Sequence, residues 1–435
     1  MNSFNIKKGH NIFLEGSPSK ELIISKSPQS IVLHPNSIKN MKTKLFVKVG
    51  DRVKVGTPVF ASKNNLEAVF VSPSSGTIED IVFGPRRVVE KVVISNKSEE
   101  CLDLDFSVSK DSLLKSGLWN EFRQKPFSKI PNSESSPAEI YISAMPTEPF
   151  ALDYEFLFSK VDNFLQKGID ALKQIFDCEI NFSSFNNSSV FSNLKNVNHY
   201  SFNNLHPAGN VGVQIHHIKP IKNSDDARWY ISLQALNRIG EFYTTKKYPN
   251  HMFASVGGNS AFKSAIYKIM IGTKVSDFIK INESSMRLIS GDVLNGSEIS
   301  SHNSLNYFDE VLSVIKIDNK REFLGWLMPG FDKYSISNTF LSKFNNNKSA
   351  SLSTKVNGSV RTIVPMGNWD KVMPMDIMTE YLVKNILAKD IEMMEKLGIY
   401  ECSPEDFSLC SFSCQSKVEV SKIIQEGLDL MEAEG

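Results

Sequence analysis

Apolar and polar residues alternate through two glycine-centred segments near the start of the chain. These are VKVGDRVKVGTPVF at residues 47–60 and VSPSSGTIEDI at residues 71–81. Alternation of this kind predicts β-strands with one face buried and the other in water. Gly50 and Gly76 stand where tight turns favour glycine. The two segments therefore predict two similar strand-and-turn halves that pack against each other.

Two such halves are typical of a barrel-sandwich domain of the biotinyl/lipoyl-like type, which we assign to residues 41–100. Carrier domains of this fold hold biotin or lipoate on a lysine in the hairpin between the halves. Counting inward from the flanking glycines places that position at Asn65 or Leu66, and Lys63 is out of register. The segment therefore predicts a structural or docking module, with an acyl or biotinyl carrier as the competing interpretation.

Strand and helix patterns alternate between residues 101 and 258. The apolar run at 139–144 predicts a buried strand, residues 179–185 and 229–233 are expected to form further strands, and helical spacing predicts helices such as Gln234–Tyr243. This alternation predicts a mostly parallel, Rossmann-like α/β sheet. A dinucleotide-binding sheet carries G-x-G-x-x-G after its first strand, where this chain has Met-Pro-Thr. The sheet is therefore not expected to bind NAD(P)H or a flavin through that loop.

Three more elements are expected in the same segment. A helix is predicted over Lys110–Arg123, in the polar connector before the first strand. Apolar residues at helical spacing from Leu157 to Ile175 predict another. His251–Val256 is expected to be a further strand of this domain.

The remaining segments complete an α/β and α+β multidomain chain. Residues 1–40 hold two short strand candidates, Glu21–Ile24 and Ser30–Leu33, and we expect them to pack on the α/β domain. Short strands and glycine turns in residues 259–330 predict a β-grasp (SLBB-like) domain. Residues 331–435 are expected to form a mainly helical C-terminal domain, because apolar residues recur at helical spacing after Asp376.

Bulk composition narrows the class of protein. The 435 residues are 41% hydrophobic and 22% charged, as in ordinary globular proteins. A net charge of +1 gives no electrostatic basis for nucleic-acid binding. The start has no apolar core of signal-peptide length, and no stretch approaches the roughly twenty apolar residues of a spanning helix. We therefore expect a cytosolic protein or one peripheral to a membrane.

The densest polar cluster is HPAGNVG at residues 206–212, followed by a histidine pair. Close glycines let the backbone bend or approach another group, and the histidines can hydrogen-bond a ligand carbonyl. The alternative is a structured loop whose histidines are capped by backbone groups. No Cys, Asp or Glu lies at metal-site spacing nearby, so no metal is expected. The candidate ligand or partner contacts are His206, Pro207, Gly209, Gly212, His216 and His217.

Two smaller features carry candidate chemistry. Arg86 and Arg87 lie on a predicted turn, where they either bind a phosphate or partner carboxylate or form a solvated tip. Cys402, Cys410 and Cys414 cluster near the C-terminus, but their spacing differs from the C-x-x-C-x-x-C run of a cubane site. No catalytic constellation and no metal site is predicted.

Several motifs, in a shared order along nearly the whole chain, resemble one family. The chain is similar to the A subunit of the sodium-translocating NADH:ubiquinone reductase (Na+-NQR). The motifs are IKKGHNIFLEGSP, VKVGDRVKVGTPVF, SPSSGTIEDI, GPRRVVEKVVI, HPAGNVGVQIHHI, RLISGDVLNG, VPMGNWDKVMPMDI and EDFSLCSFSCQSK.

The resemblance implies a peripheral protein on the cytoplasmic side of a bacterial inner membrane. It implies the B to F subunits of Na+-NQR as partners, with the membrane-embedded B subunit as the chief docking site, and ubiquinone as the substrate at this end of the complex. The complex uses NADH, FAD, FMN, riboflavin and an iron–sulfur centre, whereas the A subunit is expected to bind none of these cofactors. The alternative is a non-catalytic assembly scaffold without direct quinone contact.

The chain departs from the family pattern at two places. HPNSIKNMKT at residues 34–43 stands where the family has a stretch ending in Gly-Met-Arg-Pro. Gln415-Ser416-Lys417 stands where Pro-Gly-Lys is common. The ligand contacts that the family makes through the first loop, and a metal at the last cysteine, are therefore not expected in this chain.

Overall fold

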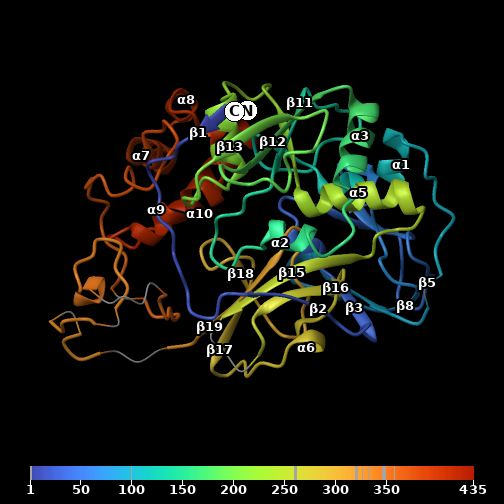
Figure 1. Ribbon diagram of the computed structural model, residues 1–435, viewed down its shortest axis with the longest axis horizontal. Helices are drawn as coiled ribbons and strands as arrows, with labels where there is room; N and C mark the ends of the chain where they lie inside the picture. Colours follow the sequence, from blue (N-terminus) through green and yellow to red (C-terminus); the bar gives the residue numbers. More distant parts are fainter. Residues whose placement is uncertain are drawn as a thin grey trace.

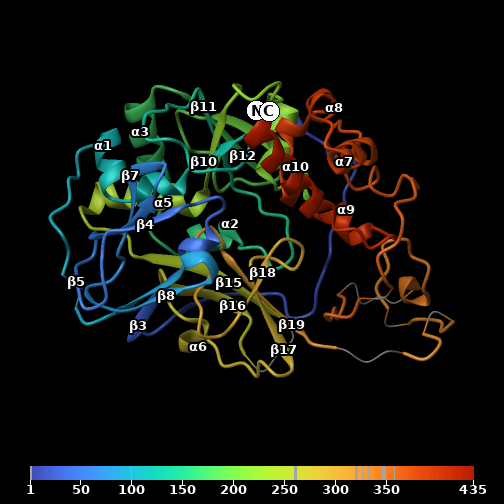
Figure 2. The same ribbon diagram turned by 180° about the vertical axis from the view of Figure 1, so that it is seen from behind.

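The protein is described by a computed structural model in which four sheets organise the chain (Figures 1 and 2). The structure describes residues 2–98, 100–258, 262–318, 322–325, 327–331, 333–344, 349–356 and 358–435. Two of the sheets have six strands each, and two smaller sheets lie near the N-terminus.

The two small sheets form the predicted strand-and-turn halves. One has the order β4-β6-β7 and the other β3-β9-β8-β5. Their shared core includes Ile31, Val59, Val92 and Ile94, which are fully buried. The strands are β3 (Ser30–Leu33), β4 (Thr43–Leu45), β5 (Arg52–Val53), β6 (Pro58–Ser62), β7 (Asn65–Val71), β8 (Gly76–Phe83) and β9 (Val89–Ser95), with 3-10 turns η1 (Pro35–Ser37) and η2 (Pro85–Arg87).

The hairpin between the halves differs from the count made on the sequence. Ala61 pairs with Val69, but the next residue, Ser62, pairs with Asn65, so three residues of β7 bulge out of the ladder. Lys63 therefore stands at the hairpin tip, where counting had placed Asn65 or Leu66. A bulge changes the register without a sequence signal that spacing alone can detect.

The first six-stranded sheet confirms the predicted mostly parallel arrangement. Its order is β1-β13-β12-β11-β14-β10, and only β10 at the edge is antiparallel. Helices α3 and α5 pack together on one face, where a Cβ on Gly240 would lie 2.1 Å from the Phe164 carbonyl oxygen. The elements are β1 (Asn2–Phe4), β10 (Arg123–Lys125), β11 (Glu139–Ser143), α2 (Tyr154–Phe158), α3 (Leu165–Phe176), β12 (Glu179–Phe185), β13 (Asn198–Phe202), α4 (Val211–Ile218), β14 (Arg228–Ser232) and α5 (Leu233–Thr245).

Two helix predictions in this segment were wrong in extent. The helix expected over Lys110–Arg123 is α1 (Lys110–Lys115), a 3-10 turn η3 (Leu118–Glu121) and then strand β10. Gly117 separates them at φ +78°, a backbone conformation that favours glycine and ends helices. The helix expected from Leu157 to Ile175 is divided into α2 and α3.

The second six-stranded sheet has the order β18-β17-β19-β15-β16-β2. The predicted strand His251–Val256 belongs to this sheet and not to the parallel one. The N-terminal residues join three sheets, because β1, β2 and β3 each pair in a different one. The elements are β2 (Ser19–Ile24), β15 (His251–Gly258), β16 (Ala265–Met270), α6 (Val275–Phe278), β17 (Met286–Ser290), β18 (Ser297–Ile299) and β19 (Val311–Lys316).

Helices near the C-terminus cover the other face of the parallel sheet. Their core is continuous with Tyr141, Phe202, Val213 and Tyr230 of that sheet and its α4 helix. Between residues 331 and 378, the described residues hold one short 3-10 turn, η4 (Leu341–Phe344). The helices are α7 (Thr379–Ala388), α8 (Ile391–Lys396), η5 (Ile399–Glu401), η6 (Pro404–Phe407), α9 (Ser408–Ser413) and α10 (Val420–Glu434).

Within the described parts of the chain, no helix has the length and apolar character needed to cross a bilayer.

Candidate functional site

The predicted polar loop, residues 206–212, lies where strand β13 leads into helix α4. His206 is 1% exposed, and its Nδ1 lies 3.1 Å from the Thr147 hydroxyl. Its Nε2 is buried without a hydrogen-bond partner among the described residues. Burial lowers the pKa of His206 to about 4, so the ring is neutral at physiological pH. This histidine is enclosed by the fold and does not face solvent.

His216 and His217 lie on α4, where His216 faces the C-terminal segment and His217 packs against Phe4 and Phe202 of the parallel sheet. The His216 Nδ1 lies 2.7 Å from the Glu401 carboxylate, and its Nε2 accepts a hydrogen bond from the Asp376 backbone N–H at 3.0 Å. Burial lowers the pKa of His217, whose ring packs 6.0 Å from the Phe4 ring. Both nitrogens of His216 are thus engaged in joining α4 to the C-terminal segment.

The two glycines of the loop allow close packing. A Cβ on Gly212 would lie 2.1 Å from the Asp406 carboxylate and 2.3 Å from the Lys125 ammonium. A Cβ on Gly209 would lie 2.4 Å from the Met145 carbonyl oxygen. Both distances are far shorter than real Cβ contacts, so only glycine fits at either position.

Lys125 and Asp406 form a buried ion pair beside this glycine. Their charged atoms lie 3.2 Å apart, and the side chains are 1% and 0% exposed. The Asn210 amide also donates to Asp406, at 3.1 Å. We call residues 206–217 with Lys125, Glu401 and Asp406 the seam, because these side chains link the parallel sheet to the C-terminal helices. The structure thus brings the six predicted contact residues together, with Pro207 at the cis peptide that follows His206.

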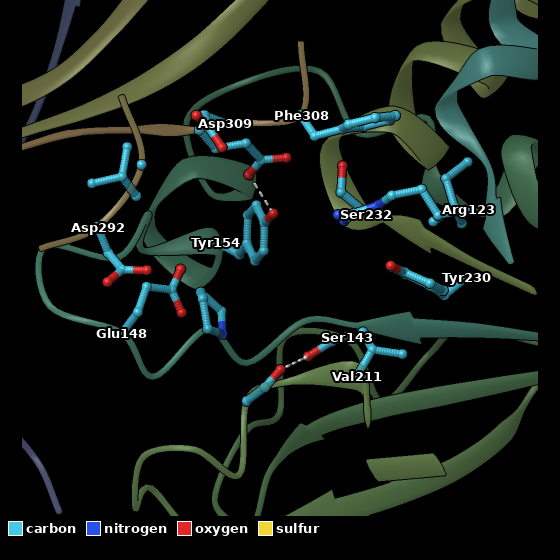
Figure 3. Close-up of a pocket in the computed structure, with 16 residues that line it drawn as sticks. Arg123, Ser143, Glu148, Tyr154, Val211, Tyr230, Ser232, Asp292, Phe308 and Asp309 are labelled. Carbon is cyan, nitrogen blue, oxygen red and sulfur yellow. Dashed lines mark hydrogen bonds between the residues drawn. The ribbon is translucent and has the colours of Figure 1, made fainter. Parts of the chain in front are cut away.

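A cavity of about 220 Å³ opens next to the seam, at the carboxyl ends of β11 and β14 (Figure 3). Ligands of α/β proteins bind preferentially at this end of a parallel sheet. Ser143 and Ser232 end the two strands there, and Gly209 of the seam forms part of the wall. The other lining residues come from β10, β14, α2, the loop after β11, the start of α4, and the second sheet with its loops.

Four carboxyl groups line the cavity. Burial raises the pKa of Glu148 to about 7, with a further contribution from repulsion by Asp292. Burial also raises the pKa values of Asp292, Asp309 and Glu310. The carboxyl groups also have partners in the chain: the Leu294 and Asn295 backbone N–H groups for Asp292, the Ser290 hydroxyl for Asp309, the Tyr154 hydroxyl for Glu310, and backbone N–H groups of residues 147–148 for Glu148.

Among the described residues that line the cavity, Arg123 is the cation, and its charge partly opposes the rise that burial causes in the pKa of Asp309. The Arg123 guanidinium lies between two rings, 4.6 Å from the Tyr230 centroid and 4.7 Å from the Phe308 centroid. Such stacking holds a guanidinium in place while its N–H groups remain free to donate. The Tyr230 hydroxyl also points into the cavity (Figure 3).

The sequence did not identify this cavity, because its charged residues come from separate segments of the chain. One signal was available. Ser143 and Ser232 end predicted parallel strands, and Glu148 follows the first of them closely. The rule that ligands bind at carboxyl strand ends would have marked those positions.

Arg86 and Arg87 form the tip of the β8–β9 hairpin, with exposed side chains. Both have positive φ values, 55° and 58°, which are unusual for residues other than glycine. Phe83 and Val88 beside them are 52% and 48% exposed. The predicted docking residues are therefore accessible.

The three clustered cysteines lie inside the C-terminal domain. Cys402, Cys410 and Cys414 are buried, and burial raises the pKa of Cys402 well above its usual value. Among the residues that the structure describes, no group of three or more His, Cys, Asp or Glu side chains is placed to hold a metal ion. The thiols pack as small apolar groups in the core of the C-terminal helices.

Comparison with known proteins identifies the family. The description "NqrA N-terminal barrel-sandwich hybrid domain" matches residues 4–97, and "NqrA second alpha/beta domain" matches residues 105–248. A hydrogenase structure, NAD+-reducing [NiFe]-hydrogenase in the air-oxidized state, is 8% identical over 69% of this chain and 55% of its own. Its TM-score of 0.37 is too low to support an argument.

Full-length relatives agree with both domain matches. The A subunit of the Na(+)-translocating NADH-quinone reductase of Rhodopirellula baltica is 33% identical over 99% of this chain and 98% of its own length. The same protein of Vibrio atlanticus is 31% identical, and that of Yersinia pseudotuberculosis 32%, each over 99% of both chains. The chain belongs to the NqrA family, the A subunits of the Na+-translocating NADH-quinone reductases.

Proposed function

We propose that this chain works as the A subunit of a sodium-translocating NADH-quinone reductase, at the step that reduces ubiquinone. The observation that carries the proposal is the end-to-end match to relatives with that name, which leaves no large part of the chain unmatched. In this proposal the chain is peripheral, lies on the cytoplasmic side of a bacterial inner membrane and docks chiefly on the membrane-embedded B subunit. The flavins and the iron–sulfur centre belong to its partners.

The geometry of the seam supports a shaping role more than direct quinone contact. His206 is enclosed and His216 has both ring nitrogens engaged. A quinone oxygen would have to displace a partner to bind the His216 ring, and it would have to enter the closed core to reach the unpartnered Nε2 of His206. The loop therefore holds the C-terminal helices against the parallel sheet, and the chain shapes the quinone-reducing end without a catalytic residue of its own.

We also propose a Rossmann-like domain and a β-grasp domain within the chain. Helices α3 and α5 on one face of the parallel sheet support a Rossmann-like domain in residues 101–258. The mixed sheet around β15 to β19 supports a β-grasp (SLBB-like) domain in residues 259–330.

Deletion of the chain from native membranes tests the proposal. NADH oxidation should continue with ferricyanide, which takes electrons from exposed flavins, while reduction of a short-chain ubiquinone should fall to background. Re-expression of the chain should restore quinone reduction. Retained quinone reduction in the deletion strain would contradict the proposal.

A second candidate is an assembly scaffold with no specific role at the quinone step. The engagement of His206 and His216 inside the chain favours it, since these were the expected quinone contacts. In that case, deletion should lower the ferricyanide and quinone rates together, because the whole complex would fail to assemble.

A further inference from the structure

The cavity at the carboxyl ends of β11 and β14 has chemically different ends. In Figure 3, Arg123, Tyr230 and Phe308 lie on one side of the open space, and Glu148 and Asp292 lie on the opposite side. The volume of about 220 Å³ exceeds the roughly 150 Å³ of a protein cavity that holds benzene. There is room for a small organic molecule.

At the Arg123 end, hydrogen-bonding groups lack acceptors within the described chain. Tyr230 is 3% exposed, and its hydroxyl has no hydrogen-bond partner among the described residues. Burial raises the pKa of Tyr230, the nearby Ser128 side chain partly opposes this shift, and no hydrogen bond of normal geometry joins the two side chains. A buried polar group without a partner destabilises the fold by about 1–3 kcal/mol, so a ligand acceptor here would relieve an existing penalty.

The Arg123 guanidinium lies beside this hydroxyl. The two flanking rings fix its plane, while no carboxylate of the described chain forms an ion pair with it within 4 Å. A guanidinium presents paired donors that match a carboxylate. This end of the cavity therefore suits an anionic group with oxygen acceptors.

The opposite end suits a cation. Glu148 and Asp292 repel each other across a desolvated space, and Glu310 adds to the negative potential at Glu148. An ammonium group placed between them would remove that repulsion. No described set of three acidic, histidine or cysteine side chains converges on a point that would hold a metal ion, which favours an organic cation.

We propose that this cavity binds a small zwitterion, with its carboxylate on Arg123 and Tyr230 and its ammonium group on Glu148 and Asp292. A simple anion would meet the repulsion of the acidic end, and a simple cation would leave Arg123 and Tyr230 unpaired. Only a ligand with both charges satisfies both ends. The site is independent of the quinone step, so either proposal can fail without the other.

Three matched probes test this inference on the full chain. They are 4-aminobutyrate, which carries both charges, butyrate, which lacks the ammonium group, and butylammonium, which lacks the carboxylate. Saturation-transfer NMR at millimolar probe concentrations should detect 4-aminobutyrate at least tenfold more tightly bound than either analogue. Equal binding of butyrate and 4-aminobutyrate, or no binding of any probe, would overturn the proposal.

Variants locate the binding within the cavity. Glu148→Gln should weaken 4-aminobutyrate at least tenfold and leave the weak binding of butyrate unchanged or improved. Tyr230→Phe removes one hydroxyl and should weaken both carboxylate-bearing probes. Lys97→Gln, at an exposed position outside both the cavity and the docking tip, serves as the control and should leave the affinity for all three probes unchanged. Unchanged affinity for 4-aminobutyrate in both folded cavity variants would place any observed binding elsewhere and overturn the assignment.

Discussion

The seam and the cavity share Gly209, yet they use polar groups in opposite ways. In the seam, most charged and ring groups are partnered within the chain, as His216 is by Glu401 and Lys125 is by Asp406, and the unpartnered Nε2 atoms of His206 and His217 are buried. In the cavity, the Arg123 guanidinium has no ion-pair partner within 4 Å among the described residues, and the Tyr230 hydroxyl has no hydrogen-bond partner among them. Polar groups with internal partners stabilise a fold, whereas those without partners mark a place where a ligand can bind. A dense polar motif in a sequence does not distinguish the two.

Gly212→Ala should produce the largest effect on stability, because its Cβ would enter the space between Lys125 and Asp406. Separating or displacing a buried ion pair costs about 3–5 kcal/mol. Urea denaturation should show this loss. Gly84→Ala is the matched control, because its Cβ would meet only the flexible Glu90 side chain at the surface. Equal small losses in the two variants would show that the seam is not tightly packed.

Lys125→Met should be nearly as damaging, since it leaves the Asp406 carboxyl buried without its cation. We expect a loss of about 3 kcal/mol in the free energy of unfolding. Adding Asp406→Leu should recover much of this loss, because two apolar side chains leave no buried charge without a partner. If adding Asp406→Leu lowers the free energy of unfolding by as much again as Lys125→Met does alone, the two residues act independently.

His216→Ala should lower stability by about 2 kcal/mol, through loss of the hydrogen bonds to Glu401 and Asp376. In the assembled complex, the KM for ubiquinone should stay unchanged at temperatures where the variant is folded. A raised KM without loss of stability would return His216 to the list of quinone contacts.

Glu148 gives the cavity a pH dependence. Its pKa in the folded chain is about 7, against a usual value of 4.5, so between these pH values the folded protein retains a proton that the unfolded chain has released. The stabilising free energy that comes from this retained proton is fully present below pH 4.5 and is lost as the pH rises through 7. Glu148→Gln should stabilise the protein at pH 8 by up to about 3 kcal/mol and leave it unchanged at pH 4. Identical dependence of stability on pH in the wild type and in Glu148→Gln would show that Glu148 is well solvated.

Arg86→Glu with Arg87→Glu should have the smallest effect on stability, within about 0.5 kcal/mol, because neither side chain is buried. The same change should reduce copurification of the chain with membrane partners, if this tip is a docking contact. Lys97→Glu, on an exposed loop near the same sheet, controls for net charge. Undiminished copurification would remove the tip from the docking surface.

Local patterns predicted the elements well where local interactions decide them. Strand Glu179–Phe185 has the predicted bounds, since its apolar residues end at Phe185 and two asparagines follow. Ser232 starts α5 close to the expected position, because its side chain accepts a hydrogen bond from the Ala235 N–H and caps the helix.

Prediction failed where distant contacts decide the outcome. The bulge that moves Lys63 to the hairpin tip depends on how β7 packs, and the position of β15 depends on pairing with β16 and β19. Residues 206–210 of the HPAGNVG motif form a loop and Val211–Gly212 begin α4, while the partners Asp406 of Asn210 and Glu401 of His216 lie nearly 200 residues away. The cavity combines segments that only the tertiary fold brings together.

Titration of the folded chain with 4-aminobutyrate, in the wild type, His216→Ala and Glu148→Gln, tests most directly whether the cavity and not the seam binds ligand. The affinity should be retained in His216→Ala and lost in Glu148→Gln. Loss of binding in folded His216→Ala together with full binding in Glu148→Gln would contradict the distinction between the two regions.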